Sequence, residues 1–164
     1  ATAGIHIKYD LDRIKRADPR LPMHPHYAFD TNVIILTLFP GIQENIIRNA
    51  LSTPGLKAVI LKTYGSGNAP QKPWFIKLLT EVTQRGIVIV NISQCPTGTV
   101  EMARYETGIH LLDAGVISGY DATVESVLTK LMFLLGHDLT PQEIRNEMSR
   151  SLAGEITRPE MPTR

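Results

Sequence analysis

The chain has 164 residues, a length that suits one hydrophobic core, and 43% of its residues are hydrophobic, as in a globular protein. Its 17 basic and 16 acidic residues give a formal charge of +1, so composition provides no electrostatic footprint for nucleic acid or an anionic membrane. A single cysteine, Cys95, excludes an internal disulfide and a cysteine-based zinc site. No apolar run approaches the roughly 18 residues that a membrane span needs.

The first 30 residues differ in pattern from the rest. Gly4–Tyr9 alternates apolar and polar residues, which is the period of a half-exposed strand. Three prolines then follow closely, at Pro19, Pro22 and Pro25. Proline at this density disfavours both helix and central strand, so an extended linker or surface arm is expected. The start at Ala1, without an initiator methionine, favours a piece of a longer protein over simple methionine removal.

Residues 32–93 alternate between apolar runs and segments of helical periodicity. Three apolar runs rich in β-branched residues predict buried strands at 32–39, 56–62 and 87–93. Apolar residues at helical spacing predict helices at 42–52 and 71–86, the second ended by Gly86. Strands that are apolar throughout and alternate with amphipathic helices are typical of parallel βαβ units covered on both faces. The predicted fold class is therefore α/β.

After Ser93 the pattern is helical. A short helix is predicted at Tyr105–Ala114, and the clearest periodicity, over 122–135, predicts another that Asp121 caps. The last helix has a strong start signal, because Thr140, Pro141 and Glu143 form a capping box with proline at the first helical position.

The carboxyl ends of the three predicted parallel strands meet at one edge of the sheet, where open α/β sheets bind ligands. Asn68 lies in one of the loops there, followed three residues later by Gln71. This spacing favours an N-cap of the next helix. The alternative is that the amide projects toward a ligand, and a cap that uses only the oxygen leaves the NH₂ group for that purpose.

Other candidate chemistry at this edge is weak. A dinucleotide fingerprint starts at Gly65 and Gly67 but fails at Pro70, and no P-loop is present. Lys62 is expected to be a rim residue with its charge in water or an anion clamp. Cys95 is expected to be a small buried apolar group rather than a nucleophile, since no histidine is placed in sequence to activate it.

Two histidines, His24 and His26, flank a proline in the arm, but no third ligand accompanies them, so no metal site is predicted. No pattern of nucleophile, base and orienting acid is present in the chain. The residues alone therefore predict a binding edge without a catalytic set.

Three long segments resemble one family: VILKTYGSGNAP, VNISQCPTGTVEM and AGVISGYDATVESVLTKL. In this order and spacing they resemble the C-terminal domain of type I (cytoplasmic) bacterial L-asparaginases, and the likeness covers nearly the whole chain. The resemblance implies a small Rossmann-like open parallel sheet of about four strands flanked by helices. It assigns residues 1–30 to the last strand of an N-terminal domain plus an interdomain linker, and residues 31–164 to the C-terminal asparaginase domain.

The family hydrolyses L-asparagine to L-aspartate and ammonia with a threonine nucleophile and without metal or cofactor. The threonine motifs belong to the N-terminal domain and do not occur here, so the resemblance implies that this chain is inactive alone. It also implies a homotetramer built from intimate dimers, in which the Y-G-x-G-N loop closes a neighbouring subunit's active site. The motif matches at Tyr64, Gly65, Gly67 and Asn68, and the resemblance implies that Tyr64, Gly67 and Asn68 contact the substrate in the neighbouring subunit.

The resemblance further places Lys62 and Cys95 near an allosteric asparagine site that some members have. Lysine stands where the family pattern has arginine, and lysine lacks the bidentate grip on a carboxylate, which weakens that expectation. Two alternatives to the enzyme role remain. One is a non-catalytic binding or regulatory module of the same fold. The other is the asparaginase-like subunit of an archaeal tRNA amidotransferase, or an animal relative with extra domains.

Overall fold

The computed structural model describes residues 2–9, 11, 14, 18–103 and 106–157. Its centre is a four-stranded parallel sheet in the order β3-β4-β5-β6, and the α/β prediction is confirmed. The strands are β3 (Val33–Thr37), β4 (Ala58–Thr63), β5 (Val88–Ser93) and β6 (Ile117–Ser118). The first three match the predicted apolar runs. Residue patterning did not locate β6, because a strand of two residues is too short to show a period.

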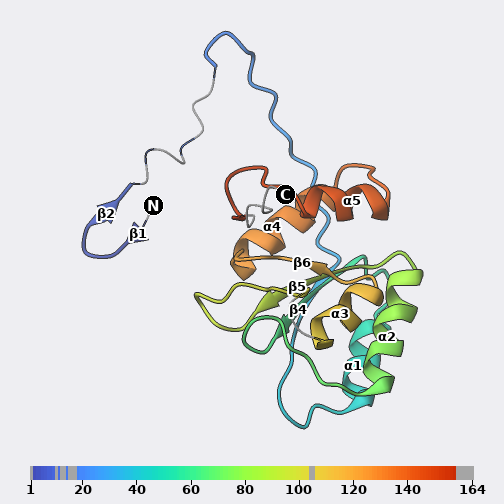
Figure 1. Cartoon of the computed structure of the whole chain (residues 1–164). Coiled ribbons are helices and arrows are strands. Elements are labelled where there is room, and N and C mark those ends of the chain that lie inside the picture. Colours follow the sequence, from blue (N-terminus) through green and yellow to red (C-terminus); the bar gives the residue numbers. More distant parts are fainter. Residues whose placement is uncertain (1, 10, 12–13, 15–17, 104–105, 158–164) are drawn as a thin grey trace, which may run out of the picture.

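In the described part of the chain, five helices cover the sheet in two layers (Figure 1). They are α1 (Glu44–Leu51), α2 (Pro73–Gln84), α3 (Glu106–Asp113), α4 (Val124–Leu135) and α5 (Pro141–Met148). Each strand is added beside the one before it, so crossovers of one hand place α1, α2 and α3 on the same face. The chain then crosses to the other face with α4 and α5. Tyr105, the predicted start of α3, lies outside the described residues.

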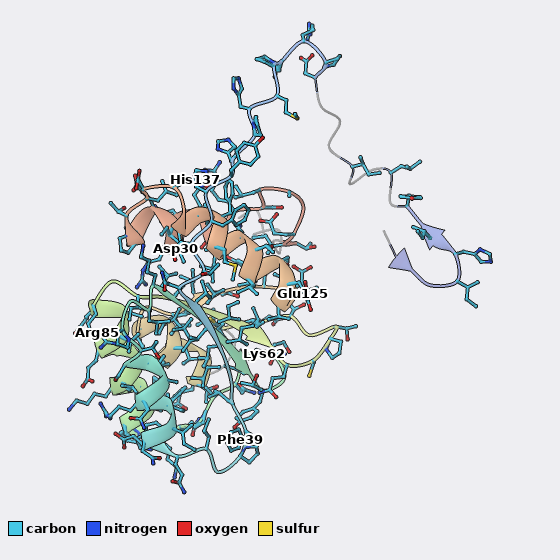
Figure 2. All side chains as sticks on the ribbon, turned by 180° about the vertical axis from the view of Figure 1, so that it is seen from behind. Asp30, Phe39, Lys62, Arg85, Glu125 and His137 are labelled. Carbon is cyan, nitrogen blue, oxygen red and sulfur yellow. The ribbon has the colours of Figure 1, made fainter. Side chains whose placement is uncertain are left out.

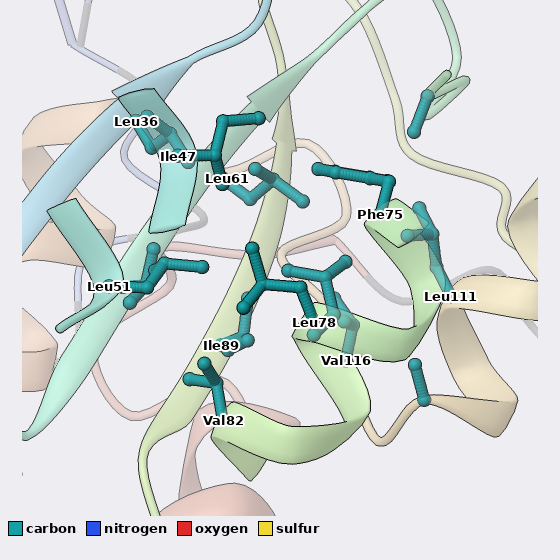
Figure 3. Packing of buried hydrophobic residues seen from close by; sticks show 14 of the residues in the cluster. Leu36, Ile47, Leu51, Leu61, Phe75, Leu78, Val82, Ile89, Leu111 and Val116 are labelled. Atoms are coloured by element: carbon teal, nitrogen blue, oxygen red, sulfur yellow. The ribbon is translucent and has the colours of Figure 1, made fainter. Parts of the chain in front are cut away.

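Alternation along the strands divides the core in two. In β4, Val59 and Leu61 pack with the α1–α3 side, whereas Ala58 and Ile60 pack with α4 and α5. Figure 3 shows the first cluster, in which Leu61 packs with side chains from α1 and α2 between these helices and one face of the sheet. Complete burial of a large apolar side chain contributes roughly 1.5–3 kcal/mol. Because both faces are covered, the strands can be apolar throughout.

The helix starts confirm one capping prediction and correct another. At α5, the Thr140 hydroxyl accepts from the Glu143 amide at 3.3 Å, and the Glu143 carboxylate accepts from the Thr140 amide at 2.8 Å. The prediction that Asp121 caps α4 is wrong. The helix begins at Val124, so the cap position falls on Thr123, and Asp121 instead accepts from the Thr157 amide at 2.7 Å.

The N-terminal part forms a separate hairpin and arm (Figure 1). Strands β1 (Thr2–Ala3) and β2 (Ile7–Lys8) pair antiparallel, so only part of the strand expected over residues 4–9 is present. The arm is exposed over residues 19–29 and has no helix or strand there, as its prolines predict. It joins the body at Asp30, whose amide donates to Met132 O at 2.9 Å.

The C-terminal segment packs back onto α4 through a buried ion pair. Lys130 Nζ lies 2.7 Å from Glu155 Oε1, and the two side chains are only 6% and 11% exposed. The same ammonium donates to the carbonyl of Arg150, while Glu155 accepts from the amides of Leu152 and Ala153. Among the described helices, none is long and apolar enough to cross a bilayer.

Candidate functional site

The loop after β4 is a tight turn closed by its own backbone. Tyr64 O accepts from the amides of Gly67 and Asn68 at 3.0 and 2.8 Å, and the Tyr64 amide donates to Asn68 O at 2.8 Å. Gly67 has φ +109°, and a Cβ there would lie 2.9 Å from Val100 Cγ1. Only glycine meets both conditions without strain, so this residue lets the chain turn sharply and deliver Asn68 at the sheet edge.

A buried polar pair supports the loop from below. Thr63, the last residue of β4, and Asn91, within β5, are both fully buried. Thr63 Oγ1 donates to Asn91 Oδ1 at 2.6 Å, and Asn91 Nδ2 donates to Gly67 O at 3.4 Å. Ser93 Oγ adds a 2.5 Å hydrogen bond to Gly65 O. Because buried polar groups are costly unless paired, this network fixes the loop backbone.

Sequence reasoning did not assign Asn91 a role. The available signal was one amide inside the apolar strand IVIVNIS. A polar side chain at a buried strand position is costly unless it is hydrogen-bonded. For Asn91 the partners are Thr63 at the end of the neighbouring strand β4 and Gly67 in the loop that follows it.

Asn68 does not cap α2, so the capping prediction is wrong. The helix begins at Pro73, its N-cap position is Lys72, and no side chain caps it. Residues 69–72 separate Asn68 from the helix, because proline at position 73 is suited to the first helical position. The half-buried Asn68 side chain instead accepts a hydrogen bond from Thr107 Oγ1 at 2.8 Å. Its role toward a ligand stays a prediction.

Lys62 and Cys95 line one cavity of about 250 Å³ together with the start of α4. Side chains along β4 alternate between the two faces of the sheet. Thr63 is on the α1–α3 side, so Lys62, one residue earlier, lies on the α4 side, near Glu125 (Figure 2). The pKa of Glu125 lies below its usual value because the carboxylate accepts from its own amide and from the Thr123 hydroxyl, with a smaller contribution from the charge of Lys62. Cys95 is exposed, which corrects the prediction of a buried thiol.

No group of three metal-ligating side chains occurs within the described ranges. His26 instead pairs with His137, with Nδ1 and Nε2 3.1 Å apart, where the arm meets α4. This contact belongs to the attachment of the arm and lies apart from the strand-end loops.

Residues 32–148 match the Glutaminase/Asparaginase C-terminal domain family. L-asparaginase 1 of Escherichia coli (strain K12) is 45% identical over 156 residues, covering 94% of this chain and 45% of the relative. The 60 kDa lysophospholipase of Homo sapiens is 37% identical over 165 residues, covering 100% of this chain and 28% of the relative.

The solved structure of L-asparaginase I from Vibrio cholerae O1 superimposes with a TM-score of 0.76 at 44% identity, covering 80% of this chain and 39% of that one. The chain thus spans less than half the length of these relatives. The family match, the sequence identities and the shared fold agree, and the chain belongs to the glutaminase/asparaginase C-terminal domain family.

Proposed function

We propose that this chain works as the C-terminal domain of a type I L-asparaginase, which hydrolyses L-asparagine to L-aspartate and ammonia. In this proposal Asn68 reaches an active site whose threonine nucleophile belongs to the N-terminal domain of a neighbouring subunit. The observation that carries the proposal is the loop Tyr64–Asn68, a turn at the carboxyl edge of the sheet whose hydrogen bonds hold one uncharged amide in a defined position.

The chemistry is positioning. L-Asparagine carries a charged amino group and a charged carboxylate, and the reacting amide must be held while a hydroxyl attacks it. A neutral amide side chain orients such groups by hydrogen bonds without adding charge to the site. Tyr64 and Gly67 contribute through the backbone of the turn. This chain supplies no nucleophile in the proposal and is inactive by itself, and neither metal nor cofactor is needed.

Exposed apolar side chains support assembly with further copies and with an N-terminal domain. Phe39, Ile109 and Leu112 are 50%, 45% and 42% exposed on the body, and the arm presents others, including Leu21 and Met23. Large exposed apolar groups are typical of interaction sites. We propose a homotetramer made of two intimate dimers in the cytoplasm. Sedimentation velocity of the assembled enzyme tests the tetramer, and a monomer at working concentration contradicts it.

A regulatory asparagine site is a second candidate function, which the cavity at Lys62 and Cys95 favours. Its wall offers an ammonium together with the carboxylates of Asp121 and Glu125, so both charges of an amino acid zwitterion would meet an opposite charge. Sigmoidal dependence of rate on asparagine that becomes hyperbolic in Lys62→Met is the expected result. Hyperbolic kinetics in the unmodified enzyme contradict this role.

The main proposal is tested by mixing the chain with a separately produced N-terminal asparaginase domain and assaying ammonia release. We expect activity from the mixture and none from either part. Asn68→Ala should lower kcat/KM about tenfold or more, since a lost hydrogen bond that leaves a buried partner unpaired costs about 1–3 kcal/mol. Asn49→Ala, an exposed asparagine on α1, is the matched control. Equal activities of the two variants refute a role for Asn68.

A further inference from the structure

The amide of Asn68 has a specific partner that is far away in sequence. Thr107 Oγ1 donates to Asn68 Oδ1 at 2.8 Å across 39 positions of the chain. Both side chains are half-buried, and Thr107 also lines an open cavity of about 560 Å³ whose wall continues through Ala69 and Pro70. The hydrogen bond therefore lies at the border between the packed body and this open cavity.

The place of Thr107 is fixed by close packing of α3. At the next residue, Gly108, an added Cβ would lie 2.2 Å from the carbonyl oxygen of Met102, so the helix touches the preceding segment backbone to backbone. Leu111, one turn later, is fully buried in the core. Because α3 is packed at both Gly108 and Leu111, the Thr107 hydroxyl has a fixed position. The hydrogen bond to Asn68 therefore forms only where the loop after β4 brings Asn68 to that position.

We propose that Thr107 is the positioning residue for Asn68 and that it determines which half of the amide faces the substrate. This inference rests on the proposed function. An asparagine amide carries an acceptor oxygen and a donor NH₂ group on opposite sides, and its terminal torsion is broad and nearly two-fold. Because Thr107 engages the oxygen, the NH₂ group is the one offered outward. Among the described residues, the hydrogen bond recorded for the Asn68 side chain is the one that its oxygen accepts from Thr107.

The substrate group that Asn68 recognises is then a hydrogen-bond acceptor. In an α-amino acid amide the acceptors are the carboxylate and the amide oxygen, whereas the ammonium group only donates. The loop alone would allow two modes of recognition. Asn68 could donate from its NH₂ group to a substrate acceptor, or it could accept from the substrate ammonium through its oxygen. The contact with Thr107 favours the first mode.

The contact itself is tested in the 164-residue chain by NMR, without any assay of activity. The side-chain NH₂ signals of Asn68 are assigned by their loss in Asn68→Ala. We expect Thr107→Val, which keeps the shape and removes the hydroxyl, to convert Asn68 from one side-chain rotamer to an averaged set. Thr107→Ser should keep one rotamer. An unchanged Asn68 rotamer in Thr107→Val overturns the proposal.

The catalytic consequence is tested in the mixture with the N-terminal domain. Thr107→Val should lower kcat/KM about tenfold, Thr107→Ser should restore most of it, and Thr107→Val added to Asn68→Ala should cost little more. The control Thr129→Val removes a hydroxyl that bonds to carbonyls of its own helix, α4, and should leave kcat/KM unchanged. Additive losses in the double variant overturn the coupling.

Asn68→Asp decides the identity of the recognised group. A carboxylate placed against a substrate acceptor should lower kcat/KM further than alanine does, because two acceptors then face each other. Activity of Asn68→Asp above that of Asn68→Ala would mean that the ammonium is recognised, which overturns the assignment. An inactive mixture with the unmodified chain counts against the proposed function, and the NMR comparison still decides the contact between Thr107 and Asn68.

Discussion

Removing the charge of Lys130 is the sharpest test of how the C-terminal segment is held. Lys130→Met keeps most of the side-chain volume but leaves Glu155, which is only 11% exposed, without its ammonium partner. Breaking a buried ion pair in this way typically costs about 3–5 kcal/mol. For a chain of this length we expect the melting temperature to fall by roughly 6–20 °C.

The direction of the Glu155 pKa shift agrees with a stabilising role for this contact. Burial alone would raise that pKa, but hydrogen bonds from the Leu152 amide, the Lys130 ammonium and the Ala153 amide outweigh it, and the pKa falls from 4.5 to about 2. Such a shift corresponds to about 3 kcal/mol of stability at neutral pH. Because the folded-state pKa lies below the unfolded one, this contribution is present above pH 4.5 and is lost as the pH falls toward 2.

Circular dichroism melts from pH 7 to pH 2 provide the assay. The unmodified chain should lose stability below about pH 4.5, and Glu155→Gln should remove this part of the pH dependence. The double variant Lys130→Met with Glu155→Leu should recover much of the loss at pH 7, since no charge is then left unpaired. If Lys130→Met stays within about 1 kcal/mol of the unmodified chain, the pair behaves like a surface salt bridge and the reasoning is refuted.

Two further substitutions test the loop and a helix start. Gly67→Ala should destabilise the chain by about 1–3 kcal/mol in urea unfolding, because φ is positive and the new methyl group would meet Val100. Gly41→Ala, also at positive φ but with no atom within 4 Å, should cost less, and equal costs would show that the contact is unimportant. Thr140→Ala should cost about 1 kcal/mol through loss of the α5 cap, whereas Thr140→Ser should be nearly neutral; equal losses contradict this.

The sequence predicted the layers of the fold well because their signals are local. Apolar runs such as Ala58–Leu61 can be satisfied only between two covered faces, and the Thr140 capping box is formed by residues three apart. Strand β6 could not be predicted from the residue pattern, because two residues are too few to show a periodicity. Its place in the sheet depends on the long-range pairing of Ile117 with Val90. Burial of Cys95 was predicted from residue type alone, although a loop at the sheet edge leaves it exposed.

The site was predicted less well, since its contacts join distant segments. Asn68 has the spacing of a local cap, but Pro73 starts the helix later, which leaves the amide to a partner on α3. Nothing near Thr107 in sequence indicates this contact. The support that Asn91 gives to the loop also depends on two strands lying side by side, a fact that becomes available only with the strand order.

The strand order has a consequence for how the chain can be made. Each strand of the main sheet pairs with the strand synthesised just before it, so none needs a later segment in order to dock. We expect β3, β4 and β5 to become protease-resistant in that order as ribosome-bound chains lengthen. The face covered by α4 closes last, when Glu155 emerges and reaches back to Lys130. Protection of that face in chains ending before Glu155 would contradict this order of assembly.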